Sequence, residues 1–334
     1  MEFQFTDDAS AATPTVLDTR KYSFTSADAA RGTEDIKIST LLDGYRVIYS
    51  NGPTTQGEFV LDSVLRVNSN GNRYNRGGAL LITEFDTEVA LGLVSNYSID
   101  TKFGSVKNID AADNAVDVWA LADDDRSPRL DTKTFPSTAS VFYLASSSAS
   151  DTAVTVEVGY VAEDGIGRTT TVALNGQSSV SLGFSALDVN RMKVTSSTAA
   201  VGDIYCITAD NFAAGGVPNT IAQTVAFIPA GYGQTQQTMF TLPAKQRAVI
   251  KSFDISMSRD NGATGSGIVT LRLKESGKSE KVIREFFPTT NSPTTKPRAN
   301  IVIPPLAQVV WRLDDASDGN TNVTITWDFE IIDD

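Results

Sequence analysis

The strongest constraint on the fold is a long stretch of short alternating segments, from about residue 138 to 195, rich in small, β-branched and hydroxylated residues. In one of these segments Val154, Val156 and Val158 alternate with Thr155 and Glu157. Successive side chains of a strand point to opposite faces, so this period of two predicts a strand with one buried face. Six such segments in succession indicate an antiparallel β-sandwich.

Turn residues separate these segments at regular intervals. The turns fall at SASD, EDGIG, LNGQ and SALD, which contain residues that tolerate tight or left-handed backbone. Asn175-Gly176 is the strongest hairpin signal in the chain, because type I′ turns favour this pair.

A second β-rich region follows the Gly- and Pro-containing stretch NFAAGGVPNT and extends to the C-terminus. In GIVTLRLKES three apolar residues face one way and Thr270, Arg272 and Lys274 face the other, which predicts a sheet with one wet face. The last segment alternates apolar residues that we expect in the core, Val323, Ile325, Trp327 and Phe329.

The pattern therefore predicts an all-β protein with little helix, built from two or three antiparallel β-sandwich or jelly-roll-like domains. One or two helical turns are expected within Ser26–Leu42. We expect four segments: a β-rich N-terminal domain, an acidic crossover that is poorer in regular pattern, a central β-sandwich and a C-terminal β-sandwich, at 1–100, 101–136, 137–215 and 216–334.

Histidine is absent from the 334 residues, and Cys206 is the single cysteine. This composition excludes His-dependent triads and His-bearing metal sites as well as an intrachain disulfide. Cys206 lies in the apolar run DIYCITA, where a buried small hydrophobe is favoured over a reactive thiol. We expect no catalytic residues and no cofactor. The alternative is a glycosidase using paired carboxylates, drawn from Glu157, Glu163 and Asp164 without support from their spacing.

The charge balance is acidic, with 40 acidic and 28 basic residues and a formal net charge of -12. Basic residues do not cluster, so nucleic acid is not an expected direct partner. No apolar run approaches the roughly 20 residues of a membrane span, and the start MEFQFTDD lacks the basic and apolar regions of a secretory signal. We expect a soluble protein that is not exported by that route and has no membrane partner.

Acidic residues gather between Asp110 and Asp125. Carboxylates at this spacing can bind calcium, but the order of an EF-hand loop is missing, so a solvated acidic loop is favoured and no metal site is assigned. Trp119, inside this segment, is expected to anchor it to the core.

Glycan binding would require exposed aromatic residues beside amides or carboxylates. Tyr74 in NRYNRGG and Tyr232 with Gln234 in AGYGQ are the candidate ligand or contact residues. The alternative interpretation of both tyrosines is a turn or packing role.

One part of the chain resembles a known family. The motifs KFGSVKNIDAADNAVDVW, TTTVALNGQSSV, FSALDVNRMKV and IPAGYGQTQQTMFTLPAKQRAVI, between about Lys102 and Phe253, together resemble uncharacterised structural proteins of tailed bacteriophages. The resemblance covers close to half of the chain.

This resemblance implies a non-enzymatic virion protein, assembled in the host cytoplasm, that decorates the head or forms a neck, collar or short fibre. Its partners would be other virion proteins, such as the major capsid, portal, neck or tail proteins. A homo-oligomer is expected, with a trimer as one such state, and the N-terminal hundred residues would attach it to the particle. The alternative is a receptor- or glycan-binding β module at a fibre tip.

Overall fold

The computed structural model describes residues 2–6, 16–21, 44–48, 73–74, 80–81, 89–113, 115–260, 262, 264–290, 294–296 and 301–333. The chain divides into two compact units, Met1–Val94 and Ser95–Asp334. Nearly all regular structure in the described residues is antiparallel β, which confirms the expected all-β class. Short 3-10 turns include η2 (Ala120–Ala122) and η3 (Ile221–Gln223).

The described residues of the first unit form two small sheets. A three-stranded sheet has the order β2-β1-β3, and β4 pairs with β5 in a second sheet. The bounds of these strands are β1 (Glu2–Thr6), β2 (Val16–Lys21), β3 (Gly44–Ile48), β4 (Arg73–Tyr74) and β5 (Leu80–Leu81). The helical turns expected within Ser26–Leu42 lie outside the described residues.

In the second unit, a six-stranded antiparallel sheet has the order β10-β9-β11-β8-β12-β13. Its strands are β8 (Ser140–Ser146), β9 (Thr155–Ala162), β10 (Gly167–Ala173), β11 (Val180–Val194), β12 (Ile204–Ile207) and β13 (Thr224–Ile228). β11 and β13 also contact each other although two strands separate them, so the sheet curls around its own core.

The alternation of apolar residues decides which face of this sheet is buried. Val154, Val156 and Val158 are fully buried in its core, as their spacing predicts. β12 is buried on both faces: Cys206 packs into this core, while Tyr205 packs into the core of the neighbouring sandwich. The predicted burial of Cys206 is thus confirmed.

The turn at Asn175-Gly176 forms, but it does not make a hairpin. Asn175 bridges Ser178, and Gly176 has the left-handed φ of 58° that the turn needs. The strands it joins, β10 and β11, are separated by β9, so the prediction of a hairpin is wrong. The predicted SALD turn is also wrong, because Ser185–Asp188 lies inside β11, where bulges absorb the irregularity.

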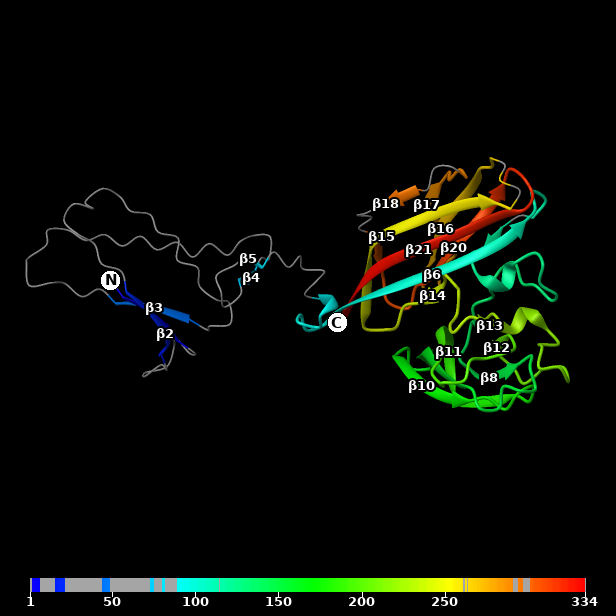
Figure 1. Cartoon of the computed structure of the whole chain (residues 1–334), viewed down its shortest axis with the longest axis horizontal. Coiled ribbons are helices and arrows are strands. Elements are labelled where there is room, and N and C mark those ends of the chain that lie inside the picture. Colours follow the sequence, from blue (N-terminus) through cyan, green and yellow to red (C-terminus); the bar gives the residue numbers. More distant parts are fainter. Residues whose placement is uncertain are drawn as a thin grey trace, which may run out of the picture. The chain divides into compact units, whose positions relative to one another are not determined.

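Two further sheets form a β-sandwich, with the orders β14-β20-β16-β17 and β18-β15-β21-β6; β7 pairs with β20, and β19 pairs with β15. In Figure 1 the long strands β15, β21 and β6 run side by side. The strands are β6 (Tyr97–Ile109), β7 (Val116–Asp117), β14 (Phe240–Thr241), β15 (Gln246–Arg259), β16 (Gly267–Lys274), β17 (Lys281–Phe286), β18 (Thr294–Lys296), β19 (Ile301–Ile303), β20 (Gln308–Ala316) and β21 (Thr321–Asp333).

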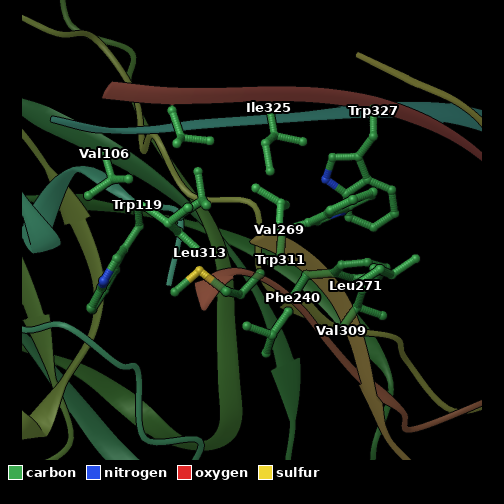
Figure 2. Packing of buried hydrophobic residues seen from close by; sticks show 14 of the residues in the cluster. Val106, Trp119, Phe240, Val269, Leu271, Val309, Trp311, Leu313, Ile325 and Trp327 are labelled. Carbon is green, nitrogen blue, oxygen red and sulfur yellow. The ribbon is translucent and has the colours of Figure 1, made fainter. Parts of the chain in front are cut away.

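Aromatic residues fill the space between these sheets. Figure 2 shows Trp327 of β21 and Trp311 of β20 among aliphatic side chains; the two indole centroids lie 6.2 Å apart. The alternating residues of the last strand are all buried, as predicted. Trp119 is 1% exposed and donates from Nε1 to the carbonyl of Leu130 at 3.0 Å, which confirms its anchoring role.

The wet face expected for β16 is only partly exposed. Lys274 is exposed, but Thr270 is buried, and its hydroxyl donates to the carboxylate of Asp314 at 2.7 Å. Arg272 donates to the same hydroxyl at 2.9 Å. Thr270, Arg272 and Asp314 therefore shield one another from solvent.

Strand pairing joins parts of the chain that are distant in sequence. β6 pairs with β21 along almost its whole length, and β13 completes the sheet that begins with β8. The four-part division at 1–100, 101–136, 137–215 and 216–334 stays a prediction. No helix in the described part of the chain has the length and apolar character needed to cross a membrane.

Candidate functional site

Tyr232 lies in the turn that follows β13. Its backbone N–H donates to the carbonyl of Pro229 at 3.1 Å, and Gly231 before it has a φ of 78°. Asp203 holds this turn, because its Oδ1 accepts from the N–H of Ala230 at 2.7 Å. The Tyr232 side chain is 44% exposed and is available for contact.

Gln234 lies two positions further on, where the chain runs along β11. The N–H of Val194 donates to the carbonyl of Gly233 at 2.8 Å. The Oε1 atom of Gln234 accepts from the Nη2 atom of Arg191 at 2.9 Å, so Gln234 orients this guanidinium. Tyr74 lies in β4 of the first compact unit and stays a separate candidate.

Sequence reasoning missed a buried ion pair between the six-stranded sheet and the sandwich. The Nζ atom of Lys133 lies 2.8 Å from Oδ1 of Asp188, and the two side chains are 0% and 1% exposed. The other carboxylate oxygen accepts from the hydroxyl of Thr241 at 2.7 Å. Asp188 lies in the interior of a strand, where a carboxylate indicates that a buried cation pairs with it. The sequence around Asp188 does not identify that cation.

A second buried carboxylate continues this polar layer into the sandwich. Asp117 accepts from the N–H of Lys133 at 2.7 Å and from Nε of Arg312 at 2.6 Å. Burial raises the pKa of Asp117 to about 6, because desolvation outweighs the favourable interaction with Arg312. The contacts tie the segment around Lys133 to both parts of the second unit.

One arginine, Arg129, pairs with three carboxylates of the acidic crossover. The guanidinium of Arg129 contacts Asp113 at 2.8 Å and Asp131 at 2.6 Å, and also contacts Asp124. Within the described ranges, no group of three or more Asp, Glu or Cys side chains is placed to hold a metal ion. Asp113, Asp124 and Asp131 thus share a cation that the chain itself supplies.

Of the carboxylates of the glycosidase alternative, Glu157 lies in β9, and Glu163 and Asp164 lie in the turn that follows it. Asp164, in the turn between β9 and β10, accepts from the N–H of Ile166 at 3.1 Å and pairs with Arg168 at 2.5 Å. These interactions, the backbone hydrogen bond first, hold the pKa of Asp164 below its usual value. A general acid needs a raised pKa, so Asp164 is unsuited to that role.

Strand β17 presents an exposed edge with apolar side chains. Among the described strands it is the last of its sheet, and its one partner there is β16. Phe286 turns inward, with its ring centroid 4.9 Å from that of Phe253, and the next residue, Phe287, is 67% exposed. Val282 on the same strand is 49% exposed. An unpaired strand edge of this kind can accept another protein.

Comparison with known proteins finds no matching family model and no matching curated protein. Among solved structures, the chain is similar to "Structure of infectious bursal disease virus Gt strain", with 12% identity over 71% of this chain and 72% of that chain and a TM-score of 0.20. It is also similar to the "infectious bursal disease virus VP2 subviral particle", with 9% identity, the same shares of the two chains and a TM-score of 0.17. At these TM-scores the likeness carries no argument about this chain.

Proposed function

We propose that this protein is a non-enzymatic structural subunit of a virus particle. In this proposal it is an accessory subunit that decorates the head or forms a neck, collar or short fibre through protein contacts. The observation that carries the proposal is the edge of β17, which no other described strand pairs; Val282 is exposed on this strand, and Phe287 is exposed immediately after it. The resemblance of about Lys102–Phe253 to structural proteins of tailed bacteriophages supports a contact with other proteins of a virus particle.

The chemistry of the second unit supports a contact role over catalysis. The buried charges around Asp188 and Asp117 have partners that join strands, and the arginines at 126 and 129 hold acidic loops. Such contacts give a rigid scaffold. A subunit that must keep its shape within a symmetric assembly needs this rigidity more than it needs reactive groups.

The remaining assignments belong to the same proposal. The subunit is assembled in the host cytoplasm, binds major capsid, portal, neck or tail proteins, and forms a homo-oligomer such as a trimer. The N-terminal hundred residues attach it to the particle. Light scattering during size-exclusion chromatography tests the oligomer, and a single monomeric mass at all concentrations would overturn that part.

Immunolabelling of purified particles tests the location. Antibodies against the chain should label intact virions, and particles that never carry the label would overturn the proposal. The edge of β17 is tested by replacing Phe287 and Val282 with Lys, which should reduce incorporation into particles. Val201→Lys is the matched control, because Val201 is also 67% exposed but lies in the connection between β11 and β12. Equal loss in the control would exclude β17 as the specific contact.

A further inference from the structure

A groove lies where the six-stranded sheet meets the sandwich. Its volume is about 280 Å³, and its lining comes from β9, β10 and β11 on one side and from β6, β14 and β21 on the other. Three of the lining side chains are cationic, Lys102, Arg168 and Arg191, and Asp100 is the one acidic residue among them. This excess of positive charge contrasts with the net charge of -12 of the whole chain.

Lys102 is the most informative residue of the lining. It is 6% exposed, its Nζ atom donates to the carbonyl of Asn190, and it lies 5.7 Å from the ring centroid of Phe240. Within the part of the chain that the structure describes, no carboxylate forms an ion pair with this amine. A buried ammonium without a counter-ion is costly, and an anion in the groove would remove that cost.

The electrostatic surroundings of Lys102 agree with this geometry. Burial is the main cause that lowers its pKa to about 8, and Lys133 and Arg191 lower it further. Asp100 and Asp188 act in the opposite direction but do not compensate. The amine therefore lies in a field that favours an added negative charge.

The two arginines differ in how far they are already engaged. Arg168 pairs with Asp164 at 2.5 Å, whereas Arg191 is held by the neutral amide of Gln234. Arg191 is exposed and forms no ion pair with the described residues. Lys102 and Arg191 are thus the two cations available to a ligand.

The walls of the groove are aromatic and apolar. Tyr160, Phe240 and Phe329 line it but are only 7%, 3% and 1% exposed, because Tyr160 is stacked on Phe184 and Phe240 on Phe329. Thr169 and Gln246 add polar groups at the lining. The buried rings thus form an apolar floor, and the polar groups at the lining can bind the hydroxyls of a sugar.

We propose that this groove binds a sugar carboxylate of about one ring, such as a uronate, with the carboxylate against Lys102 and Arg191 and the ring over the apolar floor, its hydroxyls toward Thr169 and Gln246. Charge complementarity selects the acidic group, and the apolar walls select an organic ring over a bare ion. The volume accommodates one such ring. This binding is independent of particle assembly and goes beyond the proposed structural function.

Calorimetric titration of the full chain with glucuronate tests the proposal, with glucose as the neutral match and inorganic phosphate as the bare anion. Glucuronate should bind measurably and more tightly than both. Equal affinity for glucose, equal affinity for phosphate, or no binding of glucuronate would each overturn the proposal.

Variants locate the site. Arg191→Gln should weaken glucuronate binding about tenfold, because it removes a charge-assisted hydrogen bond. Lys102→Met should do the same where circular dichroism shows a native fold. Arg284→Gln, at an exposed arginine of β17, is the control and should leave the affinity unchanged. Unchanged affinity in Arg191→Gln would overturn the proposal even if Lys102→Met failed to fold.

Proton exchange gives a further readout. A bound carboxylate should raise the pKa of Lys102 from about 8, so that binding at pH 8 takes up protons. Titrations in two buffers of different ionisation enthalpy measure this uptake. Its absence in the wild type would contradict contact between the ligand and Lys102.

Discussion

Replacing Lys133 with Met removes one partner of the buried ion pair with Asp188. The two groups are 2.8 Å apart and almost fully buried, so the variant leaves a carboxylate in a region that water does not reach. Breaking a buried pair from one side costs about 3 to 5 kcal/mol. Asp188 keeps its hydrogen bonds from the Thr241 hydroxyl and the Val189 N–H, so we expect a loss near about 3 kcal/mol.

Urea unfolding measures this loss. Trp119, Trp311 and Trp327 are buried in the second unit, so their fluorescence reports its unfolding. A loss of about 3 kcal/mol corresponds to a fall in Tm of roughly 6 to 12 °C for a folded unit of this size. The control is Arg168→Met, which breaks a pair whose side chains are 48% and 47% exposed and should cost far less stability.

Combining Lys133→Met with Asp188→Leu tests whether the loss of stability comes from leaving the Asp188 carboxylate buried without its partner. The double variant should regain part of the stability that Lys133→Met loses, because it removes the unpaired carboxylate together with its partner. The reasoning is refuted if Lys133→Met costs no more than the exposed control. It is also refuted if the two replacements are simply additive.

Three further predictions concern single positions. Gly216→Ala should lower the free energy of unfolding, measured in urea, by about 2 kcal/mol or more, because φ is 69° and the added Cβ would lie 1.9 Å from the carbonyl oxygen of Ser146. Gly215→Ala adds a Cβ in open space and should cost far less; equal costs for the two variants would contradict the clash. Burial raises the pKa of Asp117 to about 6 in the folded state. As the pH rises from 4 to 6, the unfolded state loses this proton first, so wild-type stability should fall by up to about 3 kcal/mol relative to Asp117→Asn. Parallel curves of stability against pH for the two proteins would contradict this. Burial raises the pKa of Cys206, so a thiol reagent should modify it only after unfolding; rapid reaction of the folded protein would show an open thiol.

The candidate site depends on residues whose sequence context gives little warning. Tyr232 could be selected because it is an aromatic residue close to the amide of Gln234, and the structure leaves it 44% exposed in a turn. Gln234 could be named, but its bond to Arg191 could not, because 43 residues separate them. Lys102 lies in a segment that suggested an acidic crossover, and only the strand β6 and its neighbours place its amine inside a groove.

Local patterns were sufficient for strands and for several buried faces. The alternation of Val154, Val156 and Val158 determined which side of β9 is apolar, because side-chain direction in a strand follows from its own backbone. Asn175-Gly176 likewise determined a turn, since its left-handed conformation is a local preference. The all-β class follows from such patterns repeated along the chain.

Tertiary structure alone decided which strands become neighbours. The same Asn175-Gly176 turn leads to a strand beyond β9 rather than to a hairpin, and β6 pairs with β21 from the other end of the second unit. Partner and register depend on how whole faces bury against each other, and a local alternation is compatible with many partners. The Lys133–Asp188 pair and the cationic groove exist only because those faces meet, so their chemistry is a property of the packing.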